Sequence, residues 1–145
     1  MKPYPCLWFD GRAREAAGFY CSIFKNSRIT LDTPMVVNFE INGQKFMGLN
    51  GGPMFRFNEA VSFVMDCSDQ AELDHYWSSL SADGGEESMC GWLKDKYGLS
   101  WQLVPEMLGR LMSTGEPQKA NAMMQALMKM KKLDIATLQA AYDAG

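Results

Sequence analysis

One stretch of the chain concentrates the side chains that could carry out a reaction. Cys90, two residues before Trp92, would be a nucleophile if a nearby acid–base group lowered the pKa of its thiol. Carboxylates that could serve as a general base lie in the same stretch: Glu86, Glu87 and Asp95. The chain has no second histidine that could activate Cys90, so we favour a structural role for this cysteine. For the three carboxylates we favour the alternative of exposed charges in turns.

Histidine and cysteine are too few and too scattered to predict a structural metal site. The only histidine, His75, lies beside Tyr76 and Trp77 in a segment with helical periodicity, and we expect it on the helix surface or at an interface. The cysteines contain no C-x-x-C pair: Cys6, Cys21, Cys67 and Cys90. A disulfide framework or structural zinc site is therefore not expected, and we predict buried, reduced thiols.

Aromatic and amide side chains could instead line a pocket for a small molecule. The candidate substrate-binding residues are Trp8, Asn50, Phe55, Phe57, Ser62, Cys90, Trp92, Trp101 and Gln102. In this interpretation the rings form walls, while the amides and the serine hydroxyl orient the ligand. Aromatic residues on strands also fill protein cores, so both possibilities stay open. No catalytic residue is assigned.

The elements that must position these residues follow the order strand, helix and three strands. Strands are predicted for residues 5–9, 28–32, 35–41 and 44–49 from their apolar and alternating patterns. Between the first two, apolar residues recur at helical spacing over 13–24. Asn42-Gly43 is a strong hairpin signal between the last two strands.

The same order begins again after a linker over residues 54–59. A strand is predicted for residues 61–65, and Asp69 followed by Glu72 marks the start of a second helix. Gly84-Gly85 ends that helix, and three strands fill the stretch up to Pro105.

Matched residues support a duplication. A shift of 57 positions places four residues of the first helix on the second: Glu15 on Glu72, Phe19 on Tyr76, Tyr20 on Trp77 and Ile23 on Leu80. A slightly smaller shift matches the last strands: Gly43 with Gly98, Phe46 with Trp101 and Leu49 with Val104. Because the element order also matches, we predict an α+β fold of two βαβββ modules.

The remainder of the chain differs from both repeats. We expect one domain over residues 1–105, made of paired modules at about 1–53 and 60–105, and a C-terminal helical extension over 106–145. Pro117 suits the first turn of a helix, and Asp134 can cap the last one, with Leu133 and Leu138 as a hydrophobic staple. The methionine-rich face of the extension predicts adaptable packing against the body or a partner subunit, and a Met-lined ligand site is the alternative.

Composition limits the partners. The 145 residues carry a net charge of -3 with no contiguous basic face, which argues against nucleic-acid binding. Apolar runs are too short for a membrane span, and the N-terminal residues lack the apolar core of a signal peptide. We therefore expect a cytoplasmic protein with no membrane partner.

The pattern resembles the vicinal oxygen chelate superfamily, which includes glyoxalase I, extradiol dioxygenases and bleomycin-resistance proteins, and within it the PhnB-like group named 3-demethylubiquinone-9 3-methyltransferase. The residues that carry this resemblance are Cys6 to Gly11, Glu15 to Phe24, Phe46 to Gly52, Phe55 to Asn58, Gly84 to Glu87 and Trp92 to Pro105. The resemblance implies an eight-stranded mixed sheet curled around a pocket, and a homodimer. The connection over residues 31–35 is shorter than is usual in the family.

The resemblance also frames the chemistry. Superfamily enzymes hold a divalent ion with His and Glu side chains, whereas the matching positions here fall near Cys6, Met47, Ser62 and Gln102. We therefore expect no metal and no cofactor, and a protein that binds a small-molecule ligand in the sheet. The alternatives are an enzyme of unknown reaction on an oxygen-bearing substrate and an interaction role for the tail. No glycine-rich cofactor loop supports a methyltransferase activity.

Overall fold

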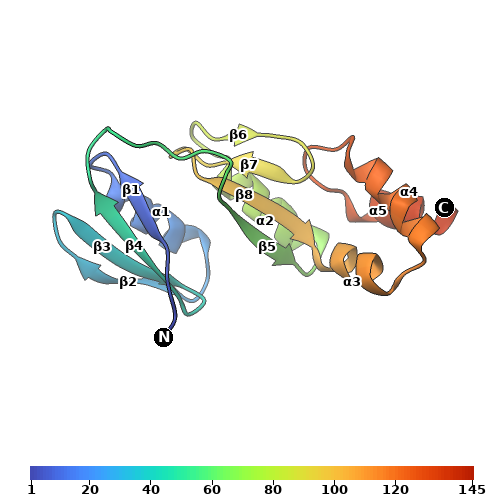
Figure 1. The fold of residues 1–145 in the computed structure, drawn as a ribbon, viewed down its shortest axis with the longest axis horizontal. Coiled ribbons are helices and arrows are strands. Elements are labelled where there is room, and N and C mark those ends of the chain that lie inside the picture. The colour runs from blue at the N-terminus through green and yellow to red at the C-terminus, as the bar shows by residue number, and fades with distance from the viewer. The chain divides into compact units, whose positions relative to one another are not determined.

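Two four-stranded mixed sheets, each with one long helix against it, form the body of the protein in the computed structural model, which describes residues 1–145 (Figure 1). The chain divides into two compact units, Met1–Phe57 and Asn58–Gly145. The first unit contains β1 (Cys6–Phe9), α1 (Ala13–Ile23), β2 (Ser27–Asp32), β3 (Val36–Ile41) and β4 (Gln44–Asn50). Its strand order is β1-β4-β3-β2, with β1 and β4 parallel and the other pairs antiparallel.

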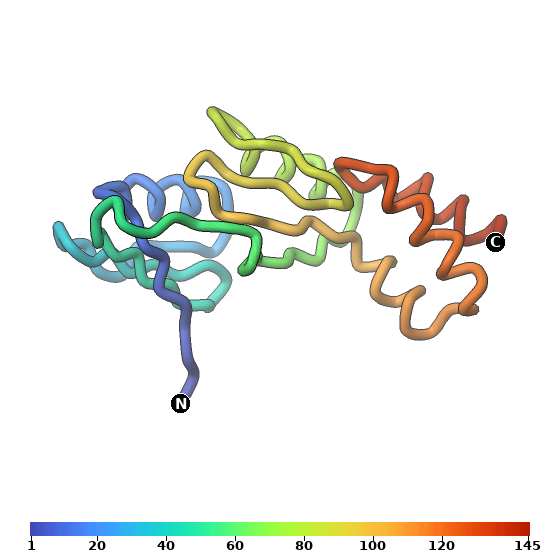
Figure 2. The backbone as a smooth tube through the Cα atoms, turned by 45° about the horizontal axis from the view of Figure 1, so that its top comes forward, coloured from blue at the N-terminus to red at the C-terminus, as the bar shows by residue number.

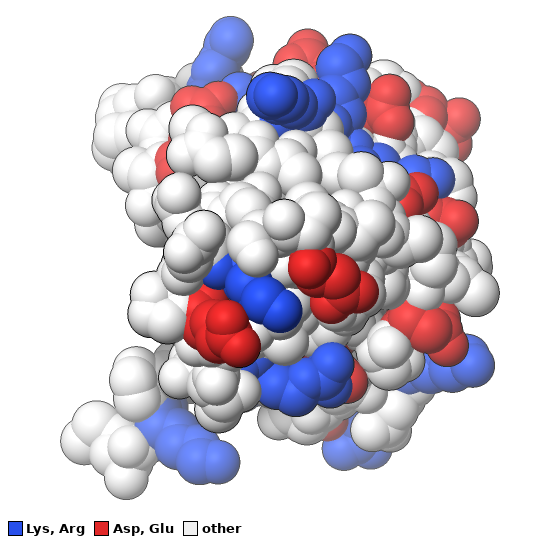
Figure 3. Space-filling model, turned by 90° about the vertical axis from the view of Figure 1, so that its right-hand side faces the viewer, with Lys and Arg blue, Asp and Glu red and all other residues white.

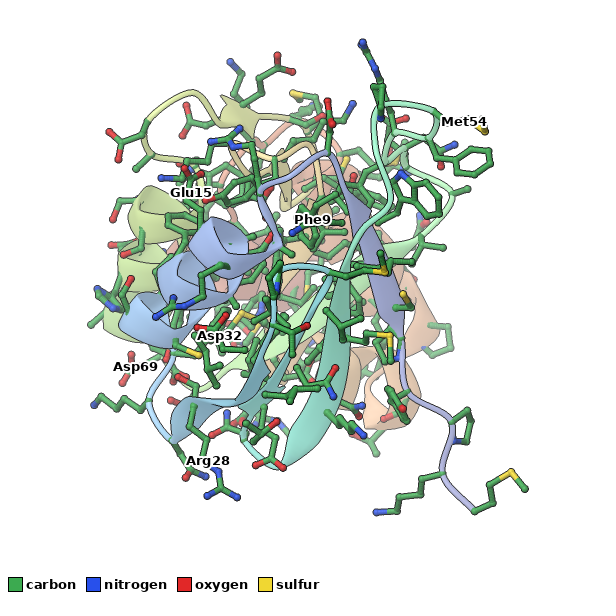
Figure 4. The ribbon with its side chains drawn as sticks, turned by 90° about the vertical axis from the view of Figure 1, so that its left-hand side faces the viewer. Phe9, Glu15, Arg28, Asp32, Met54 and Asp69 are labelled. Atoms are coloured by element: carbon green, nitrogen blue, oxygen red, sulfur yellow. The ribbon has the colours of Figure 1, made fainter.

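Small residues let α1 lie close to its sheet. Ala13, Ala16 and Ala17 are buried on the helix face that the sequence predicted. Below them, Phe39 and Phe46 pair across β3 and β4 with stacked rings 5.2 Å apart. Figure 4 shows α1 and the strands of the first sheet next to one another, with Phe9 and Asp32 labelled.

Two tight turns set the register of this sheet. Asn42 and Gly43 have φ angles of 49° and 80°, the left-handed backbone of a two-residue hairpin, so this turn is confirmed. The short connection between β2 and β3 is closed by Thr33, whose N–H and hydroxyl both donate to the carbonyl of Val36, at 2.9 and 2.8 Å. The short connection is thus a complete turn.

The second unit repeats the topology. It contains β5 (Ser62–Cys67), α2 (Gln70–Leu80), β6 (Glu86–Glu87), β7 (Trp92–Lys94) and β8 (Ser100–Pro105), in the order β5-β8-β7-β6. As in the first unit, the first and last strands, here β5 and β8, are parallel, and the other pairs are antiparallel. The bounds of α1 and α2 differ by 57 residues at both ends, which confirms the predicted βαβββ duplication and the α+β class.

One strand differs between the repeats. β6 spans only two residues, whereas its counterpart β2 spans six. After β6 the chain turns toward the C-terminal segment, where the N–H groups of Cys90 and Gly91 donate to the carbonyls of Met130 and Lys131 at 2.7 and 2.9 Å. Figure 2 shows the yellow β6–β7 loop beside the chain segment that leads from α4 to α5.

The C-terminal helices belong to the second unit. They are α3 (Glu106–Thr114), α4 (Pro117–Leu127) and α5 (Ile135–Ala144), and Pro117 occupies the first turn as predicted. Asp134 caps α5 by accepting from the N–H of Thr137 at 2.8 Å, and Leu133 and Leu138 are buried. Gln70 of α2 accepts from the N–H of Ile135 at 2.8 Å and donates to the carbonyl of Leu133 at 3.1 Å.

The thiols are less uniformly buried than predicted. Cys67 is buried, but Cys6 is exposed and Cys21 and Cys90 are half-buried, so the prediction is wrong for these three. Cys6 projects from the sheet face opposite α1, where no helix covers it. Burial, with a smaller contribution from nearby carboxylates, raises the pKa of Cys67 to about 11.

Two features bear on the predicted absence of nucleic-acid and membrane partners: the charge on the surface and the length of the helices. On the face drawn in Figure 3, acidic and basic side chains are interspersed and form no continuous basic patch. None of the helices combines the length and the apolar character that a membrane span requires.

Candidate functional site

Four of the predicted site residues lie in the first unit, and each of them has partners within that unit. The indole N–H of Trp8 on β1 donates to the carbonyl of Gly52 at 2.8 Å, and its ring meets Phe55 edge-on at 4.9 Å. Phe57 meets Phe9 in the same way at 5.4 Å. Phe55 itself is exposed, as is the neighbouring Met54, which projects from the linker (Figure 4).

Asn50, the fourth, holds the first unit together. Its Oδ1 accepts from the N–H of Ala13 at 2.9 Å, which caps the first turn of α1. Its Nδ2 donates to the carbonyl of Pro34, also at 2.9 Å. The oxygen and the nitrogen of the amide are therefore both hydrogen-bonded to the backbone, and Asn50 connects α1 to the β2–β3 turn.

The open face of the second sheet gathers three other predicted residues: Ser62, Trp92 and Gln102. Gln102 on β8 is paired directly with Trp92 on β7, so their side chains share a face. The Nε2 of Gln102 donates to the hydroxyl of Ser62 on β5 at 2.9 Å. Helix α2 packs on the opposite face, where Leu73 and Trp77 are buried.

Trp101 and Cys90 do not join this face. Trp101 alternates with Gln102 along β8 and is buried on the α2 side, 5.5 Å from the ring of Phe63. Cys90 lies in the β6–β7 loop with its thiol 3.9 Å from the carbonyl of Met128. Its backbone has φ 61°, and the contact with the C-terminal segment holds that conformation.

The prediction of an exposed turn charge is wrong for Asp95, whose residue surface is only 2% exposed. Its Oδ1 accepts from the N–H groups of Tyr97 and Leu99 at 2.9 and 3.1 Å, and its Oδ2 accepts from the indole of Trp101 at 3.0 Å. The carboxylate thus organises the β7–β8 turn. Glu86 and Glu87 are exposed, as expected, and the indole N–H of Trp77 donates to Glu87.

A pocket of about 200 Å³ opens on the same face of the second sheet. Its lining residues are Glu59, Glu86, Glu87, Ser88, Trp92, Leu93, Lys94 and Ser100. Ser100 lies directly across from Lys94 in the antiparallel pairing of β7 and β8. The residue is 1% exposed, and its hydroxyl oxygen is buried without a hydrogen-bond partner. An unpaired buried hydroxyl costs stability, so it is a feature that calls for an explanation.

Charge is concentrated at the mouth of this pocket. The Nζ of Lys94 forms an ion pair with Glu59, which lies just before β5. Hydrogen bonding to Glu59 and the negative charges of Glu59 and Glu86 raise the pKa of Lys94, and the same contact lowers the pKa of Glu59. Lys94 is therefore cationic and held in place at neutral pH.

Five lining residues of the pocket escaped the sequence analysis: Glu59, Ser88, Leu93, Lys94 and Ser100. The period of two along a strand could have found two of them, because Ser100 precedes Gln102 by two residues and Lys94 follows Trp92 by two. Glu59 lies in the linker, and only the fold brings it to Lys94. His75, by contrast, is exposed on α2 with its ring 5.1 Å from that of Tyr76, as expected for a helix-surface residue.

The donor atoms at the superfamily's metal positions do not fit a divalent ion held by histidine and carboxylate. Cys6 pairs with Met47 across β1 and β4. In the second unit, strand register places Val64, not Ser62, opposite Gln102. The amide nitrogen of Gln102 donates a hydrogen bond to Ser62. No three His, Cys, Asp or Glu side chains in residues 1–145 lie close enough together to hold a metal ion.

Comparison with known proteins places the chain in a family. The model of the 3-demethylubiquinone-9 3-methyltransferase family matches residues 1–104. The structure of the PhnB protein from Bacillus cereus is 32% identical and covers 72% of this chain and 99% of its own, with a TM-score of 0.65. No protein in the curated set matches the sequence significantly.

More distant structures share the fold alone. The fosfomycin resistance protein FosX from Listeria monocytogenes, solved with Mn(II) and sulfate, is 15% identical, with a TM-score of 0.59 and coverage of 78% of this chain and 96% of its own. A glyoxalase/bleomycin resistance protein from Albidiferax ferrireducens T118 is 10% identical, with a TM-score of 0.54 and coverage of 73% and 98%. The mixed sheets lack the parallel α/β arrangement with a glycine-rich loop, so the methyltransferase activity in the family's name has no structural support. The chain belongs to the PhnB-like 3-demethylubiquinone-9 3-methyltransferase family, and its fold is that of glyoxalase/bleomycin resistance proteins.

Proposed function

We propose that this protein binds a small molecule, without a metal, in the pocket on the open face of the second sheet. The observation that carries the proposal is at Ser100, a lining residue of the pocket whose buried hydroxyl has no hydrogen-bond partner within the protein. A ligand with a polar group would satisfy it. The hydrogen bond to the ligand would then remove the energetic cost of leaving this hydroxyl buried without a partner.

The neighbouring side chains support the proposal. Trp92 offers an aromatic surface at the pocket wall, and Gln102 and Ser62 extend the polar row along the same face. Most of the lining residues are polar or charged, and Trp92 and Leu93 supply its apolar part. Fixed polar groups beside an aromatic surface set the orientation of a small ligand. Donors of this kind orient a ligand and do not need a metal ion to do so.

The test is a binding screen with a mixed panel of small alcohols, carboxylates and amines, followed by NMR of ¹⁵N-labelled protein. We expect a member of the panel to shift the amide signals of Ser100 and Trp92. The affinity of that compound should fall roughly two- to tenfold in Ser100→Ala, which loses one hydrogen bond. Ser113→Ala is the matched control, because that serine is exposed on α3, outside the pocket.

Two results would refute the proposal. One is a panel in which nothing shifts the pocket signals. The other is binding that Ser100→Ala and Gln102→Ala leave as strong as in the wild type, since the ligand would then lie elsewhere.

We further propose that the protein is a homodimer, as the family resemblance implies, and that it acts in the cytoplasm. Exposed apolar side chains support a subunit interface at β5: Val61, just before the strand, is 63% exposed, and Val64, within it, is 59% exposed. Light scattering coupled to size exclusion should give twice the 16.3 kDa mass of one chain. Val64→Lys should convert the dimer to a monomer if this surface is the interface, whereas a 16.3 kDa wild-type species would contradict the proposal.

A further inference from the structure

The charges around the pocket indicate the chemical class of its ligand. We propose that the pocket binds a small primary-amine cation that carries a second hydrogen-bonding group, with the ammonium beside Glu86 and the second group at Ser100. This inference rests on the proposed binding function and adds to it the sign of the ligand's charge.

The pocket carries an excess of negative charge. Its lining has three carboxylates, Glu59, Glu86 and Glu87, against the single cation Lys94. Lys94 is already paired with Glu59, so its charge is compensated. Glu87 accepts from the indole of Trp77, a neutral donor that leaves its negative charge in place. Glu86 lies across from Lys94 in the pairing of β6 and β7, and its negative charge contributes to the raised pKa of Lys94, but its side chain forms no close ion pair. Three carboxylates against one cation leave the lining with a net negative charge, and Glu86 is the carboxylate with no close partner.

The uncharged lining also suits a cation with a polar tail. The face of an indole attracts ammonium groups by about 0.5–2 kcal/mol, and Trp92 is half-buried at the pocket wall on the strand that follows Glu86. The Ser100 hydroxyl can donate to or accept from a hydroxyl or carbonyl. The arrangement therefore provides a negative end, an aromatic wall and one unsatisfied hydrogen-bonding group.

The size of the pocket limits the ligand. Its volume of about 200 Å³ is below the roughly 300–1,000 Å³ of sites for drug-sized molecules. A phenol ring with a two-carbon amine is of suitable size. Tyramine meets this description, and we use it as a probe of the class, not as an identified ligand.

Three compounds with one skeleton isolate the effect of charge. Tyramine is a cation at neutral pH, tyrosol has a neutral hydroxyl in place of the ammonium, and 4-hydroxyphenylacetate is an anion. Each is titrated into the full-length protein at low salt, with NMR shifts of Ser100 and Trp92 as the measure of binding at the pocket. We expect tyramine to bind most tightly and 4-hydroxyphenylacetate most weakly.

Substitution of one carboxylate separates a specific contact from general attraction. Glu86→Gln should weaken tyramine binding roughly two- to fivefold, the range for one exposed ion pair, and should leave tyrosol binding unchanged. Glu116→Gln removes the same charge from the start of α4, outside the pocket, and should change neither. Added salt should reduce the difference between tyramine and tyrosol.

Each outcome decides the inference. Equal or tighter binding of tyrosol or 4-hydroxyphenylacetate at Ser100 would overturn the cation class and would leave the proposed binding function standing. Absence of binding by all three compounds would also overturn the cation class, and the wider panel described above would then decide whether the pocket binds anything. Equal loss of tyramine affinity in Glu86→Gln and Glu116→Gln would show attraction without a site at Glu86.

Discussion

The hydroxyl of Ser100 provides a stability test of the proposed site. We expect Ser100→Ala to make the protein without ligand more stable, although most substitutions at buried positions are destabilising. The reason is that this hydroxyl is buried in the pocket lining without a hydrogen-bond partner, and alanine removes it without leaving a large cavity.

The size of the effect follows from the cost of an unsatisfied polar group. Burial of such a group costs about 1–3 kcal/mol, and the loss of a few van der Waals contacts takes back part of the gain. We therefore expect the free energy of unfolding to rise by about 1 kcal/mol in Ser100→Ala. For a chain of this length that change raises Tm by about 3 °C.

Ser62→Ala is the matched control, because its hydroxyl accepts from Gln102 at 2.9 Å on the same sheet face. This variant should lose about 1 kcal/mol. Urea unfolding followed by tryptophan fluorescence measures both variants under the same conditions. If Ser100→Ala is destabilised as much as Ser62→Ala, the Ser100 hydroxyl has a partner in solution and the argument for the pocket fails.

Three further changes test other parts of the structure. Asp95→Ala should cost about 3 kcal/mol, because two backbone N–H groups and the indole of Trp101 lose their buried acceptor. Leu133→Ala should cost about 2–5 kcal/mol, since this side chain is buried, whereas Met128→Ala at an exposed position of the same extension should cost little. Cys67 has its pKa raised from 9.0 to about 11 by burial and then by nearby carboxylates, so the folded state holds this proton more tightly than the unfolded state. Stability should therefore fall as pH rises from 9 to 11, and Cys67→Ala should remove that part of the pH dependence.

Urea unfolding of these variants also shows which results would contradict each of the three predictions. Wild-type stability in Asp95→Ala would show that the turn does not depend on the carboxylate. Equal stability of Leu133→Ala and Met128→Ala would show that the C-terminal extension does not pack on the second module. A pH dependence that is identical with and without Cys67 would mean that its thiol titrates alike in the folded and unfolded states.

The sequence by itself determined the architecture, because the signals for it are local. The helix periods, the Asn42-Gly43 turn and the cap at Asp134 each depend on residues a few positions apart. The helix residues repeat at a shift of 57 and the last strands at a slightly smaller shift, and this repeat with the matched element order predicted the two βαβββ modules. The same local pattern also placed Trp92 and Gln102 on neighbouring strands.

Only the tertiary structure decided which of the candidate residues meet. Glu59 reaches Lys94 across 35 positions of sequence, and Gln70 holds the backbone of Ile135 across 65. No local pattern encodes such contacts, because they depend on strand register and on how the tail packs. Asp95 was misjudged for a different reason: its hydrogen-bond partners Tyr97, Leu99 and Trp101 are close in sequence, but the sequence analysis did not recognise that the turn folds around the carboxylate and buries it. The pocket's unpaired Ser100 hydroxyl is likewise a property of the packed sheet, since a serine in a strand sequence gives no sign of whether it has a partner.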